Sequence, residues 1–214
     1  MKKAKLAAIA VMAGLMLYGC SGGGGSSTFP PEQSAIYVNR DGEIYSALVK
    51  EYDAGRDYYD AAELKAMAEK EVAAYNAEHP VNQEGSKGAV TLTDCTMENG
   101  KARIVYQYAD GTSLSQFTGQ FQDAVNHAQS LEVSTVAEGL TQGKVTDGTW
   151  TDVKKDSTAA LDDVMKQSKL HLVSVSGAVS VQTEGKILYY SGNVTLKDEF
   201  TAEVTDGNAY LMFK

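Results

Sequence analysis

The residues best suited to acid–base, nucleophilic or metal chemistry are few in this chain and widely spaced. His79, His127 and His171 are its three histidines, and a metal site would need two or three of them to converge with carboxylates. Cys95 could act as a nucleophile only if a histidine lay against it. In the run VTLTDCTM it is instead typical of a small strand residue that packs and stays inert. Because the phosphate-loop, Cys-x-x-Cys, His-Glu-x-x-His and Gly-x-Ser-x-Gly motifs are also absent, we expect no catalytic residue set, no metal site and no cofactor.

Four acidic side chains gather in the run DAGRDYYDAAEL: Asp53, Asp57, Asp60 and Glu63. Calcium prefers several oxygen ligands, so this run is a candidate calcium site. Its spacing and its glycine do not follow the pattern of an EF-hand loop, and Asp60 is better explained as a helix cap. The prediction for these acids is therefore structural.

Aromatic residues offer the other candidate binding groups. Trp150, the only tryptophan, lies in a polar run where it could stack on a ligand or plug a loop onto the core. Two tyrosine pairs, Tyr58–Tyr59 and Tyr189–Tyr190, are candidate contacts for sugars or peptides. If a pair lies in a strand, its two rings point to opposite faces, so one of them faces outward.

Net charge limits the classes of partner. The chain has 19 basic and 28 acidic side chains, and residues 1–20 hold three of the lysines and none of the acids. Such an acidic protein is a poor ligand for nucleic acid, whose binding depends on neutralising phosphates. The folded part is equally unsuited to lying on anionic lipid, and the charge is explained most simply by solubility.

The beginning of the chain, MKKAKLAAIAVMAGLMLYGC, has a different kind of chemistry. Three lysines precede an uncharged apolar run, Leu6 to Leu17, which is too short for a membrane span and typical of a signal peptide. The run ends in Leu17-Tyr18-Gly19-Cys20, which resembles the lipobox of bacterial lipoproteins, although Tyr18 is larger than the usual residue. The resemblance implies that Cys20 takes a diacylglyceryl group and becomes the new N-terminus after cleavage. An ordinary secretory signal that happens to contain a cysteine is the alternative.

These features predict an order of segments along the chain. Residues 1–20 are a lipoprotein signal peptide, and residues 21–31, rich in glycine and serine, are a flexible linker stiffened at its end by Pro30 and Pro31. Only Cys95 remains after Cys20, so the lipidated protein can form no internal disulfide and must be stabilised by its core.

Residues 32–136 are expected to form a hairpin–helix–hairpin region. Asn39-Arg40-Asp41-Gly42 and Asn99-Gly100 mark the turns of the two hairpins. Between them, Asp60 caps a helix that Pro80 ends. The apolar stripe expected to face the core consists of Leu64, Met67, Ala68, Val72 and Tyr75. Residues 112–129 are ambiguous, with a short helical turn and a strand expected, and LEVSTV is an expected strand.

Residues 137–157 lack a sustained period and are the expected long loop or subdomain boundary. Residues 158–214 follow as a β-rich module with one short helix, and its final run AYLMFK predicts a buried terminal strand. The fold class is therefore α+β, with antiparallel hairpins packed on one main helix and a β-rich C-terminal module.

Two runs together resemble uncharacterised lipoproteins of clostridial Gram-positive bacteria. They are IYVNRDGEIYSALVKEYDAGRDYYDAAELKAMAEKEVAAYN and GKILYYSGNVTLKDEFTAEVTDGNAYLMFK, at the two ends of the expected mature chain. The resemblance implies an exported α+β protein, lipid-anchored on the extracellular face of the cell membrane. It implies no activity and no catalytic residue.

Three functional hypotheses remain. The first is a non-catalytic surface lipoprotein, tethered through Cys20, that contacts a cell-envelope or protein partner. The second is an extracellular hydrolase of cell-wall or dietary polymer, which needs two carboxylates facing one cleft roughly 5–9 Å apart. The third, a transporter's binding component, ranks last because that role usually needs two lobes with parallel sheets, whereas hairpins predominate here.

Overall fold

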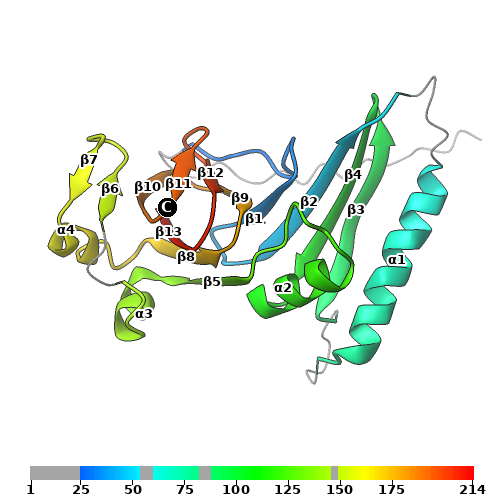
Figure 1. Ribbon diagram of the computed structural model, residues 1–214, viewed down its shortest axis with the longest axis horizontal. Helices are drawn as coiled ribbons and strands as arrows, with labels where there is room; N and C mark the ends of the chain where they lie inside the picture. The colour runs from blue at the N-terminus through cyan, green and yellow to red at the C-terminus, as the bar shows by residue number, and fades with distance from the viewer. Residues whose placement is uncertain (1–24, 54–59, 82–87, 146–148) are drawn as a thin grey trace, which may run out of the picture.

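The computed structural model describes residues 25–53, 60–81, 88–145 and 149–214. In this part of the chain, thirteen strands form two sheets and four helices pack against them, so the fold is α+β as expected (Figure 1). No helix in the described ranges is long and apolar enough to cross a membrane.

The first sheet has seven strands in the order β11-β12-β9-β1-β2-β4-β3. Both expected hairpins lie in it, one formed by β1 and β2 and the other by β3 and β4. Asn99 and Gly100 both have positive φ, 54° and 77°, as an Asn-Gly hairpin turn requires. The strands are β1 (Ala35–Val38), β2 (Ile44–Glu51), β3 (Val90–Glu98), β4 (Lys101–Tyr108), β9 (Val179–Thr183), β11 (Val194–Leu196) and β12 (Thr201–Val204).

The second sheet has six strands in the order β5-β8-β13-β10-β6-β7. The expected terminal strand is confirmed: β13 lies between β8 and β10, and its Leu211, Met212 and Phe213 are fully buried. The strands are β5 (Ser130–Thr135), β6 (Trp150–Asp152), β7 (Ser157–Ala159), β8 (His171–Ser176), β10 (Ile187–Ser191) and β13 (Asn208–Phe213).

The main helix, α1 (Ala61–Glu78), begins where the sequence predicts, because the Asp60 side chain accepts hydrogen bonds from the N–H groups of Ala62 and Glu63. Its apolar stripe is narrower than expected, since Met67 is 49% exposed. The ambiguous run 112–129 contains most of a second helix, α2 (Gly111–Gln120). The remaining helices are α3 (Val136–Thr141) and α4 (Leu161–Met165).

The core has two parts that share the six-stranded sheet. Val173 and Leu211 point from that sheet into the larger cluster, where they join apolar residues of the seven-stranded sheet and of helices α1 and α2. Their neighbours Leu172 and Met212 point the other way, into a smaller cluster. The six-stranded sheet is thus buried on both faces around β8 and β13.

The two halves of the sequence are not separate in space. Within the seven-stranded sheet, β1 pairs in parallel with β9, so Ile36 lies opposite Val181. In the six-stranded sheet, β5 pairs with β8. The ranges 32–136 and 158–214, which the sequence analysis distinguishes, therefore both contribute strands to both sheets. The range 137–157, expected to be a long loop, contains most of α3 and all of β6.

Candidate functional site

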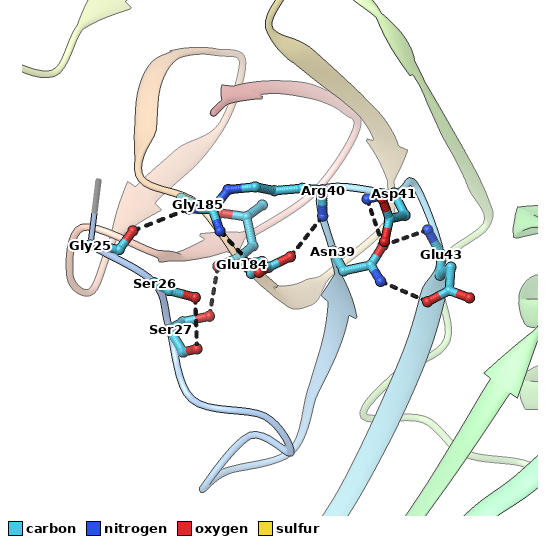
Figure 2. Close-up of polar contacts among 10 residues, drawn as sticks. Gly25, Ser26, Ser27, Asn39, Arg40, Asp41, Glu43, Glu184 and Gly185 are labelled. Carbon is cyan, nitrogen blue, oxygen red and sulfur yellow. Dashed lines mark hydrogen bonds and ion pairs between the residues drawn. The ribbon is translucent and has the colours of Figure 1, made fainter. Parts of the chain in front are cut away.

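The N-terminal segment 25–29, here called the strap, is built into the fold. The Ser27 N–H donates to the Glu184 carbonyl oxygen at 2.9 Å, and its Oγ donates to the Thr183 carbonyl oxygen at 2.8 Å. Ser26 forms a β-bridge with Gly185, just beyond the end of β9 (Figure 2). This differs from the flexible linker expected for residues 21–31, because the backbone and hydroxyl groups of the strap find partners more than 150 residues away.

Glu184 connects the strap to the turn between β1 and β2. Its Oε1 accepts from Arg40 Nη1 at 2.9 Å in an ion pair, and its Oε2 accepts from the Arg40 N–H at 2.9 Å. Arg40 Nη2 also donates to the Gly25 carbonyl oxygen at 3.3 Å. Figure 2 shows the Arg40 side chain reaching across to Gly185 and the strap. One arginine therefore fixes the turn, the end of β9 and the beginning of the strap together.

The turn itself is held by Asn39. Its Oδ1 accepts from the N–H groups of Asp41 and Glu43, and its Nδ2 donates to the Glu43 carboxylate at 2.7 Å (Figure 2). Gly42 supplies the positive φ of 80° that completes the turn. The position of Arg40 is thus set by local sequence, as the hairpin prediction implied.

At its other end the strap is held by aromatic packing. The Phe29 ring lies 4.9 Å, centroid to centroid, from the rings of both Tyr37 and Tyr45, which are directly opposite each other on β1 and β2. Phe29 nevertheless remains 41% exposed. The strap therefore lies on the face of the seven-stranded sheet turned away from the main core.

A polar groove of about 580 Å³ runs between the strap and this outer face of the sheet. Hydroxyl, amide and charged side chains predominate in it. Its lining includes Ser27 of the strap, Gln182 of β9 and Glu203 of β12. Gln33, Lys197 and Phe200, which lie outside the strands, also line the groove. Such a surface offers hydrogen-bond donors and acceptors of both charges to a polar chain lying along it.

The acidic side chains of the groove are each engaged by a neighbour. Glu203 pairs with Lys197 at 2.8 Å, and the Asp198 carboxylate accepts from the N–H groups of Phe200 and Thr201. Glu32 lies 3.6 Å from Lys101 Nζ and also approaches Arg103. These contacts fix the orientation of all three carboxylates at the groove.

The aromatic residues selected from the sequence do not gather at this groove. Trp150 is 1% exposed in β6 and packs near Tyr210 at a ring separation of 6.0 Å, so the core interpretation holds and the stacking one does not. Tyr189 and Tyr190 lie in β10 on opposite faces, each half-buried against a different core cluster. Tyr58, Tyr59 and Cys20 lie outside the described residues.

The histidines are likewise separated. The His79 ring stacks on Tyr75, the His171 ring stacks on Phe213, and His127 Nδ1 lies 3.1 Å from the Thr118 hydroxyl. Burial lowers the pKa of His171. Within the described ranges, histidine, cysteine and acidic side chains form no group of three that could hold a metal ion. Of the acids considered for calcium, Asp57 lies outside these ranges and Asp60 is the α1 cap.

Cys95 and Glu71 both lie in the region between α1 and the seven-stranded sheet. Burial and the neighbouring Asp94 raise the pKa of the Cys95 thiol, which makes its reactive thiolate form scarcer. Burial also raises the pKa of Glu71, although the Tyr106 hydroxyl donates to its carboxylate at 3.3 Å. Both shifts follow from packing under a helix.

Sequence reasoning missed the strap and its groove. The sequence predicts the hairpin turn that carries Arg40. It does not predict the strap, because the composition of the strap is that of a flexible linker and the strap's partner, Glu184, lies far away in the sequence. Comparison with protein families, curated proteins and solved structures found no match for this chain.

Proposed function

We propose that this chain is a lipoprotein anchored on the extracellular face of a bacterial cell membrane through a diacylglyceryl group on Cys20. Its folded domain serves there as a non-catalytic interaction module. The observation that carries the proposal is the sequence Leu17-Tyr18-Gly19-Cys20 at the end of an apolar run, followed within a few residues by a strap bound to the domain. Two or three acyl chains give stable anchoring, whereas one alone is marginal.

The polar groove supports the interaction role. It lies beside the strap, and its charged groups are already oriented by hydrogen bonds and ion pairs. Groups fixed in this way lose little conformational entropy on binding, which favours recognition of a partner. The partner belongs to the cell envelope or is another exported protein. The acidic net charge argues against nucleic acid.

The anchor is tested by expressing the full chain in a bacterial host that processes lipoproteins. Wild-type protein is expected in the membrane fraction and to incorporate radiolabelled palmitate, whereas Cys20→Ser should lose the label and leave that fraction. Cys95→Ser is the matched control, because it removes the chain's other cysteine and leaves the lipobox intact. Membrane association and labelling of Cys20→Ser equal to wild type would refute the anchor.

The interaction role is tested separately with a photo-crosslinking amino acid incorporated in cells. Positions Gln182 and Glu203 in the groove should give a discrete crosslinked adduct. Lys70, exposed on α1, is the control position and should not. Crosslinking that is equal at all three positions, or absent from the groove, would contradict a partner at this site.

A further inference from the structure

The strap sets the orientation of the domain, because it fixes the point at which the chain leaves the fold. Gly25 is its first described residue and lies against a defined surface: a Cβ built on it would sit 3.0 Å from Lys186 Cε and 3.2 Å from Phe200 Cζ. Arg40 donates to its carbonyl oxygen. The exit point therefore lies among Arg40, Lys186 and Phe200.

Chain length then limits the distance from this point to the lipid. Gly25 follows Cys20 by five positions, and five residues span at most about 18 Å however they are arranged. A free linker extending to Pro31 would double that number of residues and let the domain tumble. With the strap bound, the domain is held close to the membrane by one side.

We propose that the surface around Arg40, Glu184 and Lys186, here called the exit surface, faces the lipid bilayer, with α1 held away from it. The C-terminal residue belongs to the exit surface, because a Cβ on Gly185 would meet the Lys214 carbonyl oxygen. Figure 1 places α1 at one end of the long axis, well away from the marked C-terminus.

The charges of the exit surface fit a position near lipid headgroups. Arg40 is paired with Glu184, and Lys186 is paired with Glu199, so this side of an acidic protein presents balanced charge. Paired charges reduce the repulsion that an anionic leaflet would exert on exposed acids. In contrast, the exposed face of α1 is net acidic, because its exposed acids Glu63, Glu69 and Glu78 outnumber the exposed Lys65 and Lys70. Glu69 pairs with Lys65 at 3.8 Å.

This inference rests on the proposed lipid anchor, and its experiment uses the full lipidated chain reconstituted in phosphatidylcholine–phosphatidylglycerol vesicles. On a Cys95→Ser background, a donor fluorophore is attached through Lys214→Cys or through Lys70→Cys on α1. The membrane contains a lipid with a fluorescent acceptor on its headgroup. Only protein that floats with the vesicles is measured.

The efficiency of energy transfer from a donor at position 214 should be at least about twice that from a donor at position 70. The reason is that the bound strap holds position 214 close to the lipid headgroups. The double variant Ser27→Pro, Phe29→Ala removes hydrogen bonds and aromatic packing of the strap. In this variant the transfer efficiencies from positions 214 and 70 should become similar. Ser26→Ala, which leaves the Ser27 and Phe29 contacts in place, should keep the wild-type difference. Equal transfer from both positions in floating wild-type protein would overturn the orientation while leaving the anchor intact. Loss of flotation would count against the anchor.

Discussion

Arg40 and Glu184 are 144 residues apart in the sequence, yet their side chains form an ion pair at 2.9 Å. The same carboxylate accepts the Arg40 backbone N–H, so Glu184 bonds two different groups of one residue. The pair joins the first hairpin to the end of β9, and the strap lies directly beside it. The Arg40–Glu184 pair therefore contributes to the stability of the fold and helps to fix the position of the strap.

Replacing Glu184 with alanine should lower the free energy of unfolding by about 1–2 kcal/mol, because two charge-assisted hydrogen bonds are lost at a half-buried site. The measurement is urea unfolding of a truncated variant that consists of residues 25–214. Lys166→Ala is the control, since it removes a fully exposed ion pair with Asp163 and should lower the free energy of unfolding less than Glu184→Ala does. Equal effects of the two changes would show that the Arg40–Glu184 pair is an ordinary surface contact.

Binding of the strap should be visible in amide hydrogen exchange. Because the Ser27 N–H donates to the Glu184 carbonyl oxygen, its exchange should be at least about tenfold slower than in an unstructured peptide. Phe29→Ala removes the packing on Tyr37 and Tyr45 and should speed that exchange. Exchange of Ser27 at the peptide rate in the wild type would mean that the segment behaves as the linker its composition predicts.

Trp150 provides an intrinsic probe of the smaller core cluster, since it is the only tryptophan. Its fluorescence should resist quenching by iodide, because the side chain is 1% exposed. A matched exposed probe is Met165→Trp on a Trp150→Phe background, where the 41% exposed position should be quenched readily. Trp150→Ala should destabilise the fold by about 3–5 kcal/mol. Strong quenching of the wild-type protein would show that Trp150 is exposed and would make it a candidate ligand contact again.

Glu71 should make stability depend on pH in the direction opposite to that of a paired surface acid. Burial raises its folded-state pKa above 4.5 and nearby Asp123 adds to the increase, while the Tyr106 hydrogen bond opposes it. The folded state therefore binds the Glu71 proton more tightly than the unfolded chain does. The resulting stabilisation is present below pH 4.5 and is lost as the pH rises through the folded-state pKa. Glu71→Gln should therefore be more stable than wild type at pH 7 and similar near pH 4. A destabilised Glu71→Gln at pH 7 would contradict the assignment.

Local chemistry made part of this structure predictable. Asn99-Gly100 and the turn before Gly42 specify their hairpins through positive φ, and Asp60 specifies the start of α1 through its side chain. The apolar stripe predicted for α1 is wider than the face that α1 buries. A single row of residues faces the sheet, with Ala68 and Tyr75 at its centre. Met67 lies at the edge of that row.

The candidate site depends on contacts that no local pattern specifies. Ser26 and Ser27 have no apolar side chain and no regular period, so their composition alone is typical of a linker. Ser27 donates to the backbone carbonyl oxygens of Thr183 and Glu184, groups that any sequence would provide. Ser26 forms its β-bridge with Gly185. Trp150 lies in a strand and not in the expected loop for a related reason. β6 has only three residues, and besides its short neighbour β7 it pairs with β10, which follows it by more than thirty residues.

The parallel pairing of β1 with β9 also constrains the order of assembly. β1 lies in the middle of its sheet, between β2 and β9. Its pairing with β9 can form only after residues 179–183 have been synthesised. Contacts of such long sequence separation slow folding, because a large loop must close before they stabilise anything. Until then the first hairpin has an open edge able to pair with other chains. The chain therefore needs its C-terminal third before it becomes resistant to proteases and to aggregation.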